Sequence, residues 1–281
     1  MENIACNLCG ARNEQFLFYG YDIDYHTGEE QFRLVRCVSC GLVYINPRPE
    51  EKEMKNYYPD SYRPHHTKHT KESLFYYQEP LHPERRVLDV GCGSGELLES
   101  IAEREKNTAL YGVDIDERAV AASRASGFPV IHGTLFDAHY PDSYFDEIHM
   151  IHMLEHVQDP KAVLREAARI LKPAGVLKIE VPNFHNISRI IFGNKWKRLD
   201  MPRHLYHFTS RTLTVMLQRA GFSRSTVTGI ASPKYFLQSF AFWWQGKKQS
   251  YPRFVWYFFT PPARLAALLG ISSTMRAVVR K

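Results

Sequence analysis

The sequence predicts an α/β protein with a Rossmann-like, seven-stranded, mostly parallel sheet that has helices on both faces, preceded by a small β module. Two observations lead to this prediction. From Arg85 onward, short apolar segments alternate with amphipathic segments of helical length, which is typical of a parallel sheet covered on both faces. Before that point, two cysteine motifs bracket short segments of strand character. At 281 residues, the chain is long enough for one large domain and one small module.

Four of the five cysteines fall in two Cys-x-x-Cys-Gly motifs with 27 residues between them. Each motif turns two thiolates toward one point, and two motifs complete a closed tetrahedral site without an open position for substrate or water. We therefore predict a structural Zn²⁺. Paired disulfides are disfavoured by a cytoplasmic setting, and a redox motif would not need a second copy. The predicted ligands are Cys6, Cys9, Cys37 and Cys40.

Composition argues against disorder, membrane-spanning segments and secretion. Apolar residues make up 44% and charged residues 23%, which are ordinary globular values. No run of about 18 apolar residues is present, and the first residues lack the features of a secretory signal. We therefore expect a cytoplasmic protein. The net charge of +6 favours an anionic partner, such as nucleic acid, a nucleotide-linked substrate or a membrane surface, or else merely aids solubility.

Composition shifts divide the chain into three predicted parts. Residues 1–46 form the zinc ribbon, residues 47–84 form a linker or helical lid, and residues 85–281 form the large domain. Two insertions are expected in the large domain, near 185–208 and 231–262. The linker carries an aromatic cluster, which either covers the ligand site or packs against the large domain. This cluster comprises Tyr57, Tyr58, Tyr62, Phe75, Tyr76 and Tyr77.

Local patterns predict the individual elements. In the zinc ribbon, strands are expected at residues 15–19, 31–36 and 42–45. In the large domain, strands are expected at 87–90 and 109–114, near 129, 146 and 176, and at 275–281, with helices at 95–106, 117–126 and 209–222. The last of these helices begins with a capping threonine and ends at a glycine.

The strand over residues 87–90 runs into three alternate glycines and then directly into a helix. Glycines let backbone groups approach a ligand, and the helix N-terminus supplies unpaired N–H donors. A dinucleotide fingerprint would place its third glycine at Glu96, so the phosphate-binding pattern fails. The spacing of Gly91, Gly93 and Gly95, with Asp89 just ahead, suits a ligand that carries a cationic sulfonium and an amine.

At these residues the chain resembles the class I S-adenosylmethionine-dependent methyltransferases. Asp114 ends the next apolar run, where an acid can accept hydrogen bonds from both ribose hydroxyls. Residues 144–157 resemble the fourth strand of the family and the loop after it. Residues 172–183 resemble its characteristic helix, turn and fifth strand. The resemblance implies that residues 85–281 form a class I methyltransferase domain whose cofactor is S-adenosylmethionine.

The resemblance also assigns the cofactor contacts. They are Asp89, Gly91 and Gly93 beside the methionine moiety, Asp114 and Ile115 at the ribose and adenine, Thr134 and Leu135 at the adenine edge, and Gly95 and His152 as further contacts. Many relatives carry aspartate at the position of Thr134, where it accepts from the adenine amino group. In this chain Asp137 is the candidate to replace it.

Methyl transfer is an in-line displacement, so the protein must chiefly align two reactants, which supplies ~7–11 kcal/mol of the barrier. A hydroxyl acceptor also needs a base, and histidine is suited to that role. His156, beside Glu155 and just past the fourth strand, is the first candidate. His204 and His207 lie in residues 201–209, which resemble an Arg-His-Leu-x-x-Phe segment of the family. Alternatively, Glu155 and His156 brace their loop, and His207 caps a helix.

A second hypothesis uses the same side chains as metal ligands. His152, Glu155 and His156 form a His-x-x-Glu-His motif, which with His204 could gather a divalent cation. The motif is similar to the metal motif of the plant small-RNA 2′-O-methyltransferase, except that His152 replaces a glutamate. The sequence leaves open whether such a metal is bound.

Across the whole chain, the resemblance is closest to small-molecule methyltransferases that act on sugars, polyketide-like natural products or quinone precursors. An rRNA or tRNA methyltransferase is the alternative, since some of these enzymes also carry a zinc module ahead of this fold, but the chain lacks a dense basic stripe interleaved with aromatics. A non-catalytic module that binds the cofactor is the third possibility. The acceptor, the methylated atom and the oligomeric state are left open.

Two aromatic segments near the C-terminus, residues 235–244 and 254–259, have three candidate roles. They either line an apolar acceptor pocket, rest on a membrane surface beside the nearby lysines, or pack the second insertion against the core.

Overall fold

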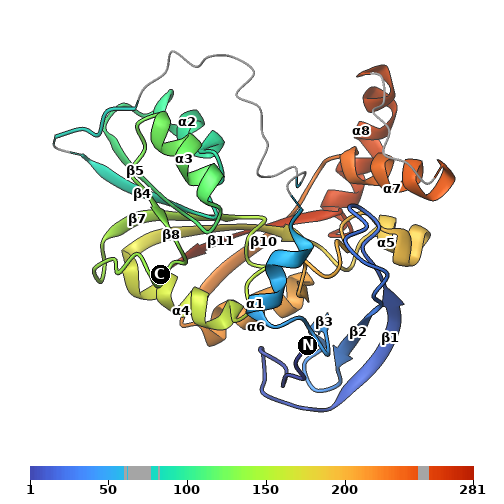
Figure 1. The fold of residues 1–281 in the computed structure, drawn as a ribbon. Coiled ribbons are helices and arrows are strands. Elements are labelled where there is room, and N and C mark those ends of the chain that lie inside the picture. The colour runs from blue at the N-terminus through green and yellow to red at the C-terminus, as the bar shows by residue number, and fades with distance from the viewer. Residues whose placement is uncertain (60–61, 63–76, 82, 246–252) are drawn as a thin grey trace.

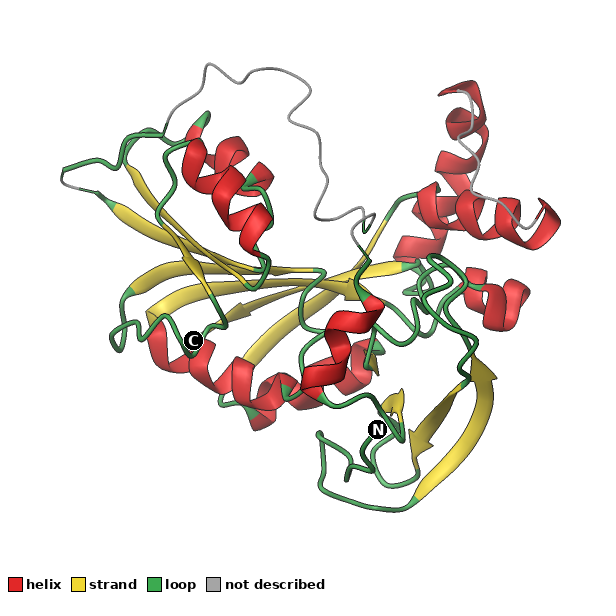
Figure 2. Ribbon diagram, in the orientation of Figure 1, coloured by secondary structure: helices red, strands yellow, loops and turns green. Residues whose placement is uncertain are grey.

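The structure is a computed structural model that describes residues 1–59, 62, 77–81, 83–245 and 253–281. In this part of the chain the strands form two sheets, drawn as yellow arrows in Figure 2. None of the described helices combines the length and the apolar character needed to cross a lipid bilayer.

The larger sheet has seven strands in the order β10-β11-β8-β7-β4-β5-β6. Its strands are β4 (Arg85–Val90), β5 (Thr108–Asp114), β6 (Val130–His132), β7 (Phe145–Ile151), β8 (Leu171–Pro182), β10 (Arg224–Ile230) and β11 (Thr274–Arg280). The five neighbouring strands β8, β7, β4, β5 and β6 are parallel to one another, whereas β11 is antiparallel to both β8 and β10. The predicted seven-stranded, mostly parallel sheet is therefore confirmed.

Helices cover both faces of this sheet, as predicted (Figure 1). Helices α2 (Glu96–Ala102) and α3 (Glu117–Ala125) lie over one face, and α4 (Pro160–Ile170) and α6 (Ser210–Arg219) lie against the other. Side-chain caps fix where these helices begin. Asp159, for example, accepts a hydrogen bond from a backbone N–H in the first turn of α4.

Helix α2 is shorter than the helix predicted over residues 95–106. Gly95 stays outside it, because its φ of 91° lies in the left-handed region. After Ala102 the chain tightens, and the Arg104 N–H donates to the carbonyl of Ile101 at 3.0 Å. The four residues 103–106 are all charged and exposed, so they offer no apolar side chain that would hold a further turn against the sheet.

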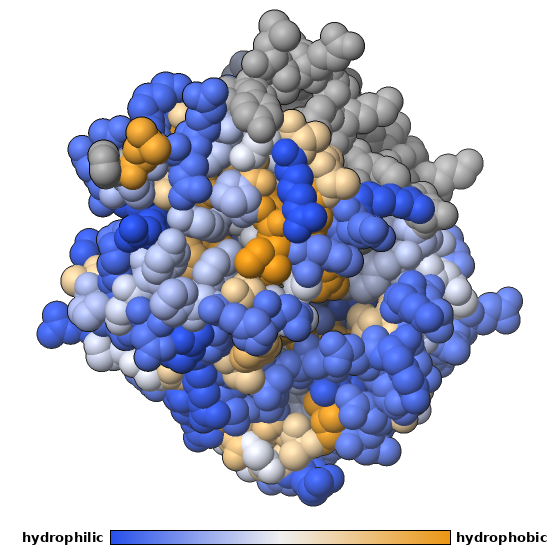
Figure 3. All heavy atoms as spheres, turned by 60° about the vertical axis from the view of Figure 1, so that its left-hand side comes forward, coloured by the Kyte–Doolittle hydropathy of each residue, from blue (hydrophilic) through white to orange (hydrophobic). Residues whose placement is uncertain are grey.

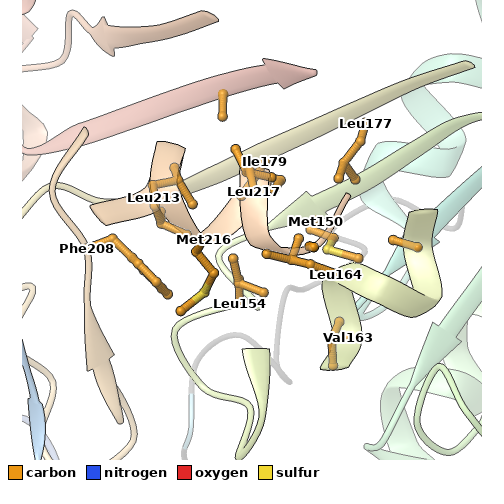
Figure 4. Packing of buried hydrophobic residues seen from close by; sticks show 14 of the residues in the cluster. Met150, Leu154, Val163, Leu164, Leu177, Ile179, Phe208, Leu213, Met216 and Leu217 are labelled. Atoms are coloured by element: carbon orange, nitrogen blue, oxygen red, sulfur yellow. The ribbon is translucent and has the colours of Figure 1, made fainter. Parts of the chain in front are cut away.

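The main hydrophobic core lies between α4, α6 and the strands β7 and β8. Figure 4 shows side chains from these elements meeting in this layer. The labelled members are Met150, Leu154, Val163, Leu164, Leu177, Ile179, Phe208, Leu213, Met216 and Leu217. The i, i+3, i+4 spacing of the apolar residues in α4 and α6 explains why one face of each helix is buried here.

The smaller sheet is antiparallel and has the order β1-β2-β3-β9. Its first three strands, β1 (Glu14–Gly20), β2 (Phe32–Cys37) and β3 (Val43–Ile45), match the predicted strands of the N-terminal part. The fourth strand, β9 (Tyr206–His207), comes from the middle of the large domain and pairs with β3. The N-terminal module and the segment around His204 therefore belong to one continuous sheet.

The linker and the insertions contain short helices and one helical pair. The linker holds α1 (Glu51–Met54) and the 3₁₀ helix η1 (Lys55–Tyr57); the insertions hold α5 (Ile187–Phe192), the 3₁₀ helix η3 (Gly193–Lys195), α7 (Lys234–Gln245) and α8 (Arg253–Leu268). Of the predicted aromatic lid, Phe75 and Tyr76 lie outside the described residues. Tyr62 and Tyr77 are buried, and the half-buried Tyr58 contacts a histidine of the site described below.

Candidate active site

The three glycines form a tight loop at the carboxyl end of β4. Gly91, Gly93 and Gly95 have φ values of 78°, 52° and 91°, all in the region that favours glycine. A Cβ on Gly91 would lie 2.8 Å from Cγ of Met153, so this position has no room for a side chain. The Gly91 N–H donates to the carbonyl of Val113 at 2.7 Å, which holds the loop against β5.

Two carboxyl groups flank this loop. Asp89 is 3% exposed, and its Oδ1 has no hydrogen-bond partner among the described residues. Burial and the nearby charge of Asp114 raise the pKa of Asp89 to about 7. The two oxygens of Asp114 accept hydrogen bonds from the N–H groups of Gly93 at 2.7 Å and Asp116 at 2.9 Å. A cation beside Asp89 would compensate its buried charge.

The remaining predicted cofactor contacts lie on the loops that follow β5, β6 and β7. Ile115 follows Asp114 directly and is 68% exposed, while Leu135 is buried. The backbone N–H and the hydroxyl of Thr134 donate to Asp137 Oδ2 at 2.7 and 2.6 Å. That oxygen of Asp137 is thus already engaged within its own loop. His152 follows β7 and has a φ of 56°, a strained value for histidine.

Glu155 is the centre of a second group of polar side chains. It is 0% exposed, and neither of its carboxylate oxygens has a hydrogen-bond donor among the described residues. Burial by itself would raise the pKa of Glu155, but His152, at 3.6 Å, and the neighbouring side chains of His156 and Arg198 lower it overall. The group is therefore a buried carboxylate that is ionised at neutral pH.

Two imidazoles stand beside this carboxylate. Nδ1 of His204 is 3.0 Å from the carbonyl of Arg198, and a carbonyl only accepts, so Nδ1 carries the proton and Nε2 keeps a lone pair. Nδ1 of His156 is 3.0 Å from the hydroxyl of Tyr58. Burial lowers the pKa of both histidines, and the charge of Arg198 lowers it further, so both are neutral at physiological pH. One ligand atom from each of Glu155, His156 and His204 lies within 4.8 Å of the others, a spacing that could hold a metal ion.

The two other predicted histidines lie outside this group. An N–H of Arg198 lies 2.6 Å from Nδ1 of His152, so His152 is engaged by a guanidinium. The His207 ring is buried 6.3 Å from that of His204, and burial lowers the pKa of His207 to about 3. His207 does not cap α6, because Thr209 is the N-cap residue. That structural alternative for His207 is therefore wrong, and its catalytic role stays a prediction.

A buried ion network positions the segment that carries His204. Arg203 is 0% exposed and pairs with Asp22 at 2.6 Å and with Asp200 at 2.7 Å. Its guanidinium also donates to the carbonyl of Tyr57 at 2.8 Å. Asp22 comes from the N-terminal module, so that module helps to shape the candidate site. Sequence patterns did not identify this network, because its members are separated by up to 181 residues.

The four predicted cysteine ligands form a second candidate metal site. Their sulfur atoms lie within 4.8 Å of one another, with 3.5 Å between Cys6 and Cys40 and between Cys9 and Cys37. Zn–S bonds of about 2.3 Å imply S–S separations of ~3.8 Å in a tetrahedron, so these residues fit zinc. All five cysteines of the chain are free, so the disulfide alternative is not realised. The turns need Gly10 and Gly41, which have φ values of 78° and 82°.

The cysteine cluster is attached to the large domain by polar contacts. The Asn7 side chain donates to Asp159, the residue that caps α4, at 2.8 Å. Arg219, near the end of α6, donates to the carbonyl of Leu8 at 2.7 Å. Both contacts hold the module against the helices that cover the core.

Comparisons with known proteins agree with this architecture, a Rossmann-like fold with a glycine loop and acids at the strand ends. The family model described as "Methyltransferase domain" matches residues 48–225, and the chain belongs to that family. A probable S-adenosylmethionine-dependent methyltransferase of Mycolicibacterium smegmatis is 32% identical over 152 residues, which cover 52% of this chain and 55% of that protein. A ubiquinone biosynthesis O-methyltransferase of Idiomarina loihiensis is 34% identical over 116 residues, which cover 39% and 46%.

The chain spans about half the length of these curated relatives. Among solved structures, a SAM-dependent methyltransferase from Archaeoglobus fulgidus has a TM-score of 0.51 and 24% identity, covering 70% of this chain and 86% of that one. This likeness confirms the fold.

Proposed function

We propose that this protein transfers a methyl group from S-adenosylmethionine to a small-molecule acceptor. The observation that carries the proposal is the buried carboxyl of Asp89, which lacks a partner on Oδ1 beside a glycine loop in a chain of the methyltransferase family. S-Adenosylmethionine carries a sulfonium and an ammonium but no phosphate. Its positive charge would therefore stabilise ionised Asp89.

The other residues around the loop fit the remaining parts of this cofactor. Each oxygen of Asp114 keeps acceptor capacity for a ribose hydroxyl beyond the backbone bond that it accepts. The exposed side chain of Ile115 would pack on the adenine, and Thr134 and Leu135 would border its edge. Because Asp137 Oδ2 is engaged by Thr134, we do not assign the adenine amino group to that oxygen. When bound, the cofactor supplies the electrophilic methyl group.

His204 and His156 are the proposed bases. The Nε2 lone pair of His204 is free to accept a proton from an acceptor hydroxyl as the oxygen attacks the methyl carbon. The low pKa of both imidazoles keeps them unprotonated at neutral pH. Glu155 would stabilise the imidazolium that forms, since its charge is buried beside both rings.

As the alternative use of the same side chains, we propose that Glu155, His156 and His204 hold a divalent cation, in which case their lone pairs bind the metal and the two histidines do not act as bases. A buried carboxylate without a hydrogen-bond donor needs a nearby positive charge, and Nδ1 of His204 already donates to a carbonyl, as metal-bound histidines usually do. Such a cation would lower the pKa of an acceptor hydroxyl bound to it. His152 is omitted from this ligand set because Arg198 contacts its ring. The four cysteines are proposed to hold a separate, structural zinc.

A small molecule is favoured as the acceptor over RNA. Matched relatives include ubiquinone biosynthesis O-methyltransferases, which points to a phenolic, quinone-like acceptor, while sugars and other natural products belong to the same chemical class of hydroxyl acceptors. Asn7 and Leu8, between the first two cysteines, bond to the helices that cover the core, which supports a structural role for that module rather than RNA binding.

A transfer assay with methyl-labelled S-adenosylmethionine tests this function. The purified protein is incubated with catechols, nucleotide sugars, hydroxylated polyketides and bulk tRNA or rRNA in parallel reactions. We expect label in a phenol or sugar together with S-adenosylhomocysteine. Label in RNA alone would replace the small-molecule proposal with the RNA one, and cofactor binding without any transfer would favour a non-catalytic module.

A further inference from the structure

The last third of the chain has a strongly asymmetric charge distribution. Residues 181–281 contain sixteen of the 36 lysines and arginines but only one of the 30 acidic residues, Asp200. That one acid is paired with Arg203 at 2.7 Å. The modest net charge of +6 is thus the sum of an acidic first part and a basic last part. Some of these cations are paired with acids from earlier in the chain, such as Lys197 with Asp24 and Arg276 with Glu180. Exposed cations of this region, among them Lys195, Lys234 and Arg264, can attract an anionic surface.

Within this basic region, α7 carries exposed aromatic side chains. Figure 1 shows α7 and α8 projecting from the body of the fold, away from α2 and α3. Phe240, Trp243 and Trp244 are 40%, 47% and 70% exposed, and their ring centroids lie within 6.4 Å of one another. Aromatic rings with an exposed edge are typical of protein surfaces that lie at the boundary between water and lipid.

Helix α8 places its large apolar residues on the outside. Tyr257, Pro261, Leu265 and Leu268 follow the spacing i, i+4, i+8 and i+11, which lies on one helical face, and all four are exposed. Leu268 is 85% exposed. Another face of α8 packs on β10 through small residues, since a Cβ on Gly229 would meet the backbone of Ala267 at 2.6 Å. This is the reverse of an ordinary surface helix, which turns its large apolar side chains inward.

Helix α5 extends this apolar surface, and three cationic side chains lie at its border. Ile190 and Ile191 on α5 are 57% and 54% exposed, and α5 packs beside α7. Lys195, Lys234 and Arg264 are exposed around the apolar side chains. The face that comes forward in Figure 3 is largely hydrophilic, with several apolar patches.

We propose that these residues of α5, α7 and α8 form a lipid-docking surface for a bilayer that contains anionic phospholipids. Amphipathic helices with Trp, Phe and Leu on the apolar side and Lys or Arg at its border lie in the plane of such membranes. In this proposal the surface lies in the plane of the membrane boundary, as such helices do. The basic border would be attracted by the negative surface potential of the lipid.

A second copy of the chain fits this surface less well. A two-fold dimer through this surface would bring Lys195, Lys234 and Arg264 of one copy near those of the other, and helices α5, α7 and α8 contain no acidic residue that could pair with them. The docking surface also borders the candidate active site, because the guanidinium of Arg198 lies 4.4 Å from the Tyr235 ring on α7 and contacts His152. The proposal does not depend on the methyl-transfer chemistry.

Vesicle flotation of the full chain tests this proposal. The wild type is mixed with vesicles of phosphatidylcholine alone or with added phosphatidylglycerol, at low and high salt. We expect flotation with the anionic vesicles that weakens at high salt. Replacing Leu268 or Trp244 by glutamate should weaken binding about tenfold or more, because a charge would enter the apolar boundary. The matched control is Leu81→Glu, since Leu81 is 94% exposed far from this surface in the sequence.

Three results would overturn the proposal. The first is that the wild type floats with neither type of vesicle. The second is that Leu268→Glu binds vesicles as well as Leu81→Glu does. The third is that the wild type is a dimer in sedimentation velocity, that Leu268→Glu is a monomer, and that neither protein binds vesicles, which would assign the surface to a second copy of the chain. Unchanged melting temperatures of the variants establish that they are folded, and unchanged cofactor binding separates this test from that of the proposed function.

Discussion

Glu155→Gln is expected to lower kcat by about 100-fold or more while leaving cofactor affinity within about twofold of the wild type. The amide keeps the shape of the side chain but loses the charge on which a divalent cation and the imidazoles of His156 and His204 depend. When both proteins are compared free of the divalent cation, removing a buried charge that lacks hydrogen-bond donors should leave the melting temperature unchanged or raise it. The measurements are steady-state kinetics, calorimetric titration with cofactor and thermal unfolding.

The control for this variant is Glu166→Gln, in which the replaced acid pairs with Arg169 on the surface of the protein. Metal analysis distinguishes a metal ligand from a residue that only braces its loop. If Glu155 is a ligand, the wild type should carry one more metal ion per chain than Glu155→Gln. Wild-type turnover by Glu155→Gln together with a lowered melting temperature would show that Glu155 only braces its loop. If a chelator leaves the activity unchanged while the cysteines keep their zinc, methyl transfer does not need a divalent cation at Glu155, His156 and His204.

Cys37→Ser is expected to remove the proposed structural zinc and to unfold the N-terminal module. Structural zinc contributes on the order of 10 kcal/mol to the folding of small domains, and Cys37 is one of four ligands in a closed site. Because β3 pairs with β9, the loss should extend to the segment of His204 and lower activity as well. Zinc content, hydrogen exchange of β1 to β3 and turnover measure these effects.

The matched control for zinc content is Cys92→Ser, because Cys92 lies in the glycine loop outside the cysteine cluster. Zinc in Cys92→Ser should equal that of the wild type. A wild-type protein that binds no zinc, or a Cys37→Ser protein that keeps both its zinc and the exchange protection of β1 to β3, would contradict the structural role.

Local sequence patterns predicted the parts of the fold that short-range physics determines. The alternation of apolar strands and amphipathic helices gave the larger sheet, and the glycine spacing gave the loop after β4. The spacing of Cys6, Cys9, Cys37 and Cys40 predicted a cluster that the structure contains. In each case the signal lies within about ten residues or in a repeated motif, so it can be recognised without knowing the tertiary contacts.

The parts that sequence could not predict depend on contacts between distant segments. Strand β9 has two residues, too few for an alternating pattern, and its partner β3 lies about 160 residues earlier. Arg203 and its partner Asp22 are 181 residues apart in the sequence, and the spacing of neither residue indicates the other as its partner. Tyr58 was expected only as part of an aromatic cluster, and its contact with His156 follows from how the linker crosses the large domain.

The most direct test of the account is a calorimetric titration of the protein with S-adenosylmethionine and S-adenosylhomocysteine, repeated for Asp114→Ala and for the exposed control Asp142→Ala. We expect the wild type and Asp142→Ala to bind both ligands at one site per chain. Asp114→Ala should lose binding, because it removes the proposed ribose contact and the bond to the Gly93 N–H. A wild type that binds neither ligand, or an Asp114→Ala protein with unchanged affinity, would contradict the proposed cofactor site.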